Sequence, residues 1–66
     1  MKNKIFEFRT KNGLTQRQLA NELGMLYQAL QRYERGSVVP PVYVAIRIAR
    51  ALHTTVEELF PIEEEE

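Results

Sequence analysis

The sequence predicts a compact all-α domain of five short helices. Apolar residues recur at helical spacing, capping and stop signals divide the chain into helix-sized pieces, and no segment alternates apolar and polar residues as a strand does. With 66 residues, the chain is expected to form a single domain over residues 1–62, followed by an acidic tail over residues 63–66.

Size and composition argue against several functional classes. A domain this small buries only about 60% of the surface of its unfolded chain, which leaves little room for a walled active site. There is no cysteine for disulfides or thiolate metal sites. No apolar run approaches the roughly 20 residues that span a bilayer, and no secretory signal is recognisable. We therefore expect a cytoplasmic chain without a membrane segment.

Charge is unevenly distributed, although the formal net charge is zero. All nine Lys and Arg lie in residues 1–50 with only three of the nine Glu, so this stretch carries a formal charge of +6. The basic stretch favours a nucleic-acid partner. The Glu run at 63–66 is expected to be a solvated tail, or alternatively to compete with phosphates for the basic face.

The first helix is expected over residues 2–11. Ile5 and Phe8 share one of its faces, and the Asn12-Gly13 pair ends it.

The second helix has the strongest start signal in the chain. Thr15 and Gln18 form a T-x-x-Q capping box, which satisfies two otherwise unpaired backbone N–H groups. Leu14 and Leu19 occupy the two positions of a hydrophobic staple. These rules agree on a helix that begins after Thr15.

The third helix is expected over residues 27–35, with Gly36 as its stop. Its apolar side carries Ala29, Leu30 and Tyr33. The opposite face is polar, amide-rich and basic, and consists of Tyr27, Gln28, Gln31, Arg32 and Arg35.

A fourth helix is expected to start near Pro41, since proline suits the first turn of a helix. It has a wide apolar face for the centre of the core, made of Val42, Ala45, Ile46, Ile48, Ala49 and Leu52. A short fifth helix follows, capped by Thr55 with Glu58 three residues later, and ends at Phe60-Pro61.

Residues 16–35 fit a helix-turn-helix motif, which inserts its second helix into the major groove of DNA. Gly24 ends the first helix of this motif and tolerates the left-handed conformation that the turn requires. Ala20, one helical turn earlier, leaves room for the second helix to cross closely.

With the helices placed, the sequence resembles the Cro/C1-type (XRE-like) helix-turn-helix family, which includes the lambdoid phage repressors. The resemblance covers residues 4–60. It rests on several short motifs at the family's spacing, chiefly GLTQ at 13–16, LA at 19–20, LG at 23–24, RYERG at 32–36, IARAL at 48–52 and VEELF at 56–60. It implies a compact five-helix, lambda-repressor-like domain that binds double-stranded DNA.

The resemblance also implies roles for individual residues. Contacts to base edges are expected from the start and outer face of the third helix, namely Leu26, Tyr27, Gln28, Gln31 and Arg32. Contacts to DNA phosphates are expected from Arg9, Thr15, Gln16, Arg17 and Arg35. A structural role is expected for Ala20, Gly24, Leu30, Tyr33 and Glu34. The family commonly pairs the arginine of the first helix with the glutamate of the third, so Arg9 should bind Glu34 first and phosphate second.

Leu26 departs from the family pattern, which usually has Ser, Thr or another capping residue before the recognition helix. Loss of a side-chain cap costs about 1 kcal/mol. Leu26 is expected either to contact a thymine methyl group or to shift the helix start.

Several other residues have simple interpretations. Arg47 and Arg50 are expected to be solvated, and the lone His53 has no second ligand for a metal. Phe6 lies off the core face, where it either packs against Phe60 or Ile62 or joins a partner surface. The apolar stretch at residues 38–43 is a second candidate partner surface.

Two functions remain in competition. The first is a DNA-binding transcriptional regulator, a repressor that binds a two-fold-related operator as a homodimer without cofactor, metal or effector domain. The second is an antitoxin-like or adaptor module whose main partner is a protein. An enzyme is disfavoured, because the chain offers neither a Ser/His/acid set nor a phosphate-cradling glycine loop.

Overall fold

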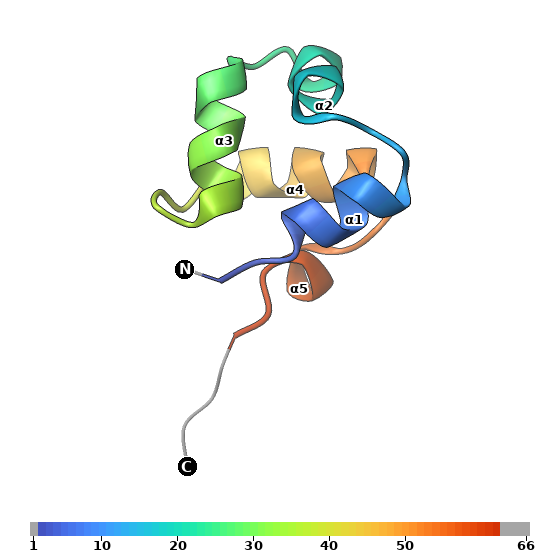
Figure 1. Ribbon diagram of the computed structural model, residues 1–66. Coiled ribbons are helices and arrows are strands. Elements are labelled where there is room, and N and C mark those ends of the chain that lie inside the picture. Colours follow the sequence, from blue (N-terminus) through green and yellow to red (C-terminus); the bar gives the residue numbers. More distant parts are fainter. Residues whose placement is uncertain (1, 63–66) are drawn as a thin grey trace.

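The computed structural model describes residues 2–62, which form five helices and no strand. The all-α fold class is therefore confirmed. In chain order the helices are α1 (Ile5–Lys11), α2 (Gln16–Leu23), α3 (Tyr27–Arg35), α4 (Val42–Ala51) and α5 (Val56–Leu59), shown in Figure 1. The predicted acidic tail, residues 63–66, lies outside the described residues. None of the described helices is long and apolar enough to cross a membrane.

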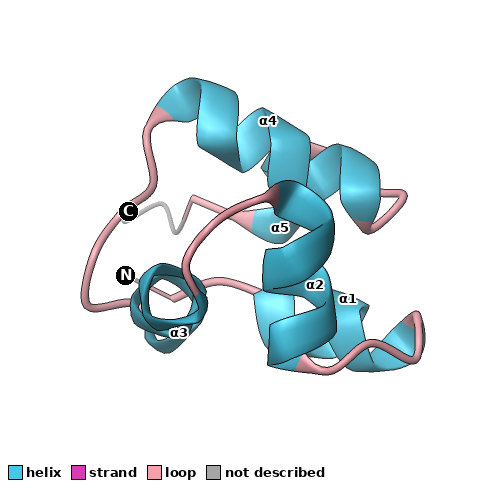
Figure 2. Ribbon diagram, turned by 90° about the horizontal axis from the view of Figure 1, so that it is seen from above, coloured by secondary structure: helices cyan, strands magenta, loops and turns pink. Residues whose placement is uncertain are grey.

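The core lies where α2 and α5 pack against α4, with α3 packed on α2. Figure 2 looks down the axis of α3 and shows α2 beside it. The largest fully buried side chains come from all five helices and the turn after α4: Ile5, Leu19, Leu30, Ile48, Leu52 and Leu59. This shared core holds α2 and α3 in a fixed relation.

Helix α1 begins at Ile5 and is shorter than expected, because Asn3 and Lys4 have other partners. The Asn3 Oδ1 atom accepts a hydrogen bond from the Ile5 N–H (3.0 Å), and the Lys4 N–H donates to the Leu59 carbonyl (2.8 Å). The Asn3 side-chain amide also donates to the Tyr33 carbonyl (2.9 Å). The N-terminal segment thus joins α3 and α5 rather than extending α1.

The capping box of α2 forms as predicted. The Gln18 N–H donates to the Thr15 hydroxyl (3.1 Å), and the Thr15 N–H donates to Gln18 Oε1 (2.8 Å). Leu14 packs against the core that contains the fully buried Leu19. Thr55 caps the fifth helix as predicted, since the Glu58 N–H donates to the Thr55 hydroxyl (3.1 Å). The Glu58 carboxylate accepts a hydrogen bond from the Thr54 hydroxyl (2.7 Å) and does not complete a capping box.

The buried face of α4 is narrower than expected. Ala45, Ile48 and Ala49 are buried, whereas Val42 is 72% exposed and Ile46 is 37% exposed. Pro41 precedes the helix as its N-cap residue. The sequence period places Val42 and Ile46 on the apolar stripe, but none of the helices within residues 2–62 covers that edge of it.

Candidate nucleic-acid interface

The turn between α2 and α3 has the geometry of a helix-turn-helix. Gly24 ends α2 in the left-handed conformation (φ +66°), a region that residues with a Cβ atom rarely adopt. Ala20 is 2% exposed and Leu30 is fully buried. Small and apolar side chains therefore hold α2 and α3 together and leave their other faces to solvent.

Helix α3 begins at Tyr27, as predicted, with Leu26 as its N-cap. Leu26 has extended backbone angles and provides no side-chain cap. Its side chain is 73% exposed. The absence of a capping residue has therefore not shifted the helix start, and the Leu26 methyl groups stand at the amino end of α3, open to a partner.

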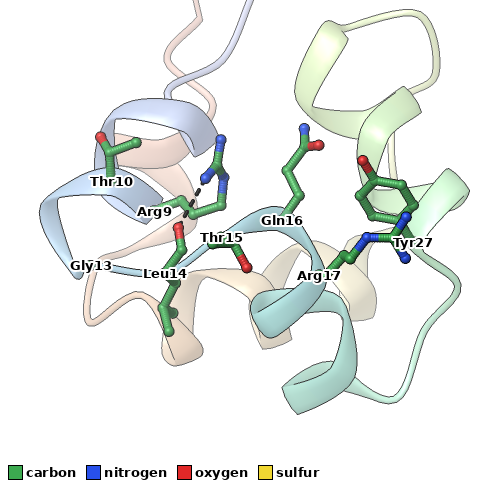
Figure 3. Close-up of a pocket in the computed structure, with 8 residues that line it drawn as sticks. All are labelled: Arg9, Thr10, Gly13, Leu14, Thr15, Gln16, Arg17 and Tyr27. Carbon is green, nitrogen blue, oxygen red and sulfur yellow. Dashed lines mark hydrogen bonds between the residues drawn. The ribbon is translucent and has the colours of Figure 1, made fainter.

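A hollow of about 550 Å³ lies between α1, the start of α2 and the start of α3 (Figure 3). Five predicted contact residues line it, together with Thr10, Gly13 and Leu14; these five are Arg9, Thr15, Gln16, Arg17 and Tyr27. The Arg17 guanidinium stacks on the Tyr27 ring, 4.2 Å from its centroid. Arg17 thus places a positive charge beside this hollow, held there by its cation–π contact with Tyr27. The N-terminus of α2, which also lies here, attracts anions through the helix dipole.

A second hollow, of about 250 Å³, adjoins the first through Gln16, which lines both. Its other lining residues are Phe6, Gln31, Glu34 and Arg35. Phe6 is 57% exposed, and the Arg9 guanidinium lies 5.2 Å from its ring centroid. The expected packing of Phe6 against Phe60 or Ile62 is therefore wrong. Phe6 lies on the side of α1 that faces α3, where it lines this hollow.

Arg9 and Glu34 form the ion pair expected from the resemblance. The Arg9 Nε and Nη2 atoms donate to the two Glu34 oxygens (2.9 and 2.8 Å), and Nη1 donates to the Leu14 carbonyl (2.9 Å). The hydrogen bonds to Glu34 raise the pKa of Arg9; burial opposes this shift, and the charge of Glu34 adds to it. Arg9 is buried at the base of the first hollow, and its phosphate role remains a prediction.

On the outer face of α3, three of the predicted contact residues have exposed side chains that are available to bind DNA. Within residues 2–62, the exposed side chains of Gln28, Arg32 and Arg35 make no hydrogen bond or ion pair. Gln31 is half-buried and differs, because its Nε2 donates to the Tyr27 hydroxyl (3.1 Å). Leu26, Gln28 and Arg32 line neither hollow.

Arg47 is a structural residue that the sequence did not reveal. Its Nη2 atom donates to the Leu23 carbonyl (2.6 Å), one of the carbonyls left unpaired at the end of α2. The expectation of a merely solvated side chain was therefore wrong. Its partner is a backbone atom 24 residues away, so no local sequence signal could have indicated the contact.

A helix-turn-helix family model matches residues 5–59 of the chain. This match covers all five helices and the turn described above. The chain belongs to the Cro/C1-type helix-turn-helix family. As a member of this family it is a DNA-binding transcriptional regulator.

Relatives of similar length occur in both archaea and bacteria. The chain is 36% identical over 66 residues to an HTH-type transcriptional regulator of Archaeoglobus fulgidus, covering 100% of this chain and 94% of the relative. It is 35% identical over 65 residues to the HTH-type transcriptional regulator YgzD of Bacillus subtilis, covering 98% of each. A Methanothermobacter thermautotrophicus regulator is 38% identical over 66 residues, covering 98% of this chain and 96% of the relative.

A solved structure supports the fold. The crystal structure of a transcriptional regulator from Listeria innocua superposes with a TM-score of 0.73 at 23% sequence identity. The match covers 100% of this chain and 65% of the Listeria chain, so this chain spans slightly less than two thirds of that regulator. The five-helix helix-turn-helix fold is thus shared with that protein.

Proposed function

We propose that the chain is a sequence-specific repressor that binds a two-fold-related operator as a homodimer, with α3 in the major groove. The observation that carries this proposal is a surface over the start of α2 and the outer face of α3 that is rich in amide and guanidinium groups, with the exposed apolar side chains of Phe6 and Leu26 beside them. Gln16 links its two hollows, Arg17 and Arg35 add positive charge to them, and the outer face of α3 beside them adds free amide and guanidinium groups. Such groups suit phosphates and base edges.

In this proposal the start of α2 is fixed on a phosphate and α3 reads bases. Gln16, Thr15 and Arg17 contact the backbone, with Arg35 at the far end of α3 and Arg9 as a secondary phosphate contact. Gln28, Gln31 and Arg32 meet base edges, and Leu26 and Tyr27 contact bases at the amino end of α3. Repression requires only that the bound domain occupies the operator, which a small domain in the cytoplasm can do.

An exposed apolar groove supports self-association. It is lined by Val39, Pro40, Val42, Ala45, Val56 and Phe60. Val39 and Val42 are 60% and 72% exposed, and Ile62, 82% exposed, extends the apolar surface past Phe60. Exposed apolar surface of this kind on a small domain marks an interface. None of its lining residues lines either of the two hollows, so pairing through the groove would leave the surface of α2 and α3 free for DNA.

Selection of bound DNA from a random library tests binding and symmetry together. The expected product is a palindrome whose half-sites are about 34 Å apart, one turn of DNA. Affinity should fall steeply with salt, by about 0.9 log units per log unit of salt for each phosphate neutralised. The absence of salt-dependent binding to any DNA fragment would contradict the proposal.

The dimer is tested by Val42→Glu, which places a charge in the groove at an exposed site and spares the core. Sedimentation of this variant should show monomers, and its operator affinity should fall. Arg50→Glu, on the same helix but outside the groove, is the matched control. A wild-type protein that stays monomeric on and off DNA would refute this part of the proposal.

The alternative function is a protein-binding module of the antitoxin or adaptor type, and the same apolar groove is the observation that favours it. The double variant Gln28→Ala with Arg32→Ala separates the two. If regulation in cells survives this change but is abolished by Val39→Glu, the protein-binding module is the better description.

A further inference from the structure

Tyr27 is held by two side chains at once. Its ring stacks on Arg17 from α2, and its hydroxyl accepts a hydrogen bond from Gln31 one turn along α3 (3.1 Å). The ring is half-buried and packs against the core. Figure 3 shows Arg17 against the ring at the edge of the first hollow. Tyr27 therefore has a fixed position from which it can orient its neighbours.

The contact with Tyr27 uses only part of the hydrogen-bonding capacity of the Gln31 side-chain amide. Its Nε2 atom has two hydrogens, and Tyr27 takes one. Within residues 2–62, the second hydrogen and the Oε1 atom have no partner, although Gln31 lines the second hollow beside Gln16 and Arg35. One donor and one acceptor thus remain on a side chain whose rotamers are already restricted.

That remaining pair of groups matches one base. Adenine presents an acceptor (N7) beside a donor (N6–H) in the major groove, whereas guanine presents two acceptors. Gln28 has the same amide, but among residues 2–62 no hydrogen-bond partner orients it, so it loses more side-chain entropy when it binds a base. The tether to Tyr27 therefore distinguishes Gln31 from Gln28.

We propose that Tyr27 is a positioning residue that holds Gln31 as the adenine reader of each half-site. This inference rests on the proposed DNA-binding function and assigns to it one base and one side-chain pair. The Tyr27 hydroxyl acts on the adenine preference through Gln31. The base contact proposed above for Tyr27 is made by its ring, which Tyr27→Phe keeps. The Tyr27 ring stacks on Arg17, whereas the hydroxyl binds Gln31, so a substitution that removes only the hydroxyl separates the two contacts.

Tyr27→Phe is the deciding variant, because it keeps the ring and its stacking on Arg17 and removes only the hydroxyl. Library selection on the wild type should first reveal one half-site position with a preference for adenine that Gln31→Ala abolishes. Tyr27→Phe should weaken that preference about fivefold, the effect of one hydrogen bond. The salt dependence of binding should not change, since phosphate contacts are kept. Tyr33→Phe is the matched control, because it removes a hydroxyl from the same helix that makes no hydrogen bond within residues 2–62.

Two further variants test whether Tyr27→Phe acts through Gln31 or only by destabilising the fold. Adding Tyr27→Phe to Gln31→Ala should cause no further loss, because the hydroxyl then has nothing to orient. Gln31→Glu lacks the donor and should shift the preference at the same position from adenine to cytosine, whose N4 amino group donates to carboxylates.

The inference is overturned if Tyr27→Phe retains the full preference for adenine, if it weakens binding equally with and without Gln31, or if Gln31→Ala leaves every position unchanged. A wild-type protein that selects no DNA would instead refute the proposed function, and this result would appear before any variant is made.

Discussion

Arg9 of α1 binds Glu34 of α3 through two hydrogen bonds: Nε donates to Oε2 (2.9 Å) and Nη2 donates to Oε1 (2.8 Å). Both side chains are about nine-tenths buried, at 10% and 9% exposure. The remaining Arg9 nitrogen donates to the carbonyl of Leu14, just before α2. A single guanidinium thus connects α1, the entry to α2 and the end of α3.

Removing one member of this pair should destabilise the fold strongly. In Glu34→Gln, the Arg9 charge stays buried without its counter-charge, which typically costs about 3 kcal/mol. Chemical denaturation should show this loss in the free energy of unfolding. Glu22→Gln, at an exposed position on α2, is the control and should change stability by less than about 0.5 kcal/mol. Equal stabilities of the two variants would show that the pair contributes little.

The raised pKa of Arg9 determines how this stabilisation varies with pH. A group whose pKa is higher in the folded state stabilises the fold fully below its unfolded pKa, and loses that effect as the pH rises through its folded pKa. For an arginine, the pH reaches the folded pKa only in strong alkali. The stability difference between wild type and Arg9→Met should therefore stay constant from about pH 7 to about pH 9. A difference that declines in this range would contradict a permanently charged guanidinium.

Gly24→Ala should destabilise the protein by about 1–2 kcal/mol, because alanine resists the left-handed conformation. No atom of the described residues lies within 4 Å of an added Cβ atom, so the cost comes from the backbone and not from a clash. Gly24→Asn should cost less, since asparagine tolerates this conformation. Thermal unfolding of the two variants distinguishes these causes: equal losses would indicate that the space around residue 24 matters more than its φ angle.

Arg17→Ala should reduce the slope of log affinity against log salt by about 0.9, the effect of one phosphate contact. It should also weaken binding to operator and non-operator DNA by similar factors, since phosphate contacts carry no sequence information. Fluorescence titrations at several salt concentrations measure both. Arg50→Ala, an exposed arginine on α4, should leave the slope unchanged. A loss confined to operator binding, with an unchanged salt slope, would instead mean that Arg17 acts by holding the Tyr27 ring and not by contacting a phosphate.

Arg47→Met should lower the free energy of unfolding by about 1 kcal/mol, because the Leu23 carbonyl loses its 2.6 Å hydrogen bond. Denaturation of this variant beside Arg50→Met separates the bond from the general effect of removing a charge from α4. The salt dependence of DNA binding should be the same in both. If Arg47→Met and Arg50→Met unfold together, the contact to Leu23 adds nothing to stability.

Local signals in the sequence predicted much of the fold. The Thr15 capping box and the ends of α2 and α3 at Gly24 and Gly36 depend on residues within a turn or two of one another. Long-range contacts were not predicted in this way. Arg47 with Leu23 and Asn3 with Tyr33 join backbone carbonyls to distant side chains, and any residue type supplies such a carbonyl.

The candidate site was predictable in outline but not in its internal contacts. Helical periodicity places Gln28, Gln31 and Arg32 on one face of α3. The contact of Tyr27 with both Arg17 and Gln31 depends on how α2 and α3 cross and on which rotamers that crossing allows. Similarly, periodicity gave the apolar stripe of α4, while its exposed edge at Val42 became visible only once the neighbouring helices were placed.

The hydrogen bond from Arg47 to Leu23 bears on protein engineering. Its donor lies on α4, outside the twenty residues 16–35. A graft of those residues onto a foreign scaffold would therefore separate the end of α2 from the guanidinium that caps it. Transfer of this helix-turn-helix to another protein therefore requires that α4 be moved with it, or that the host supply an equivalent cation at the end of α2.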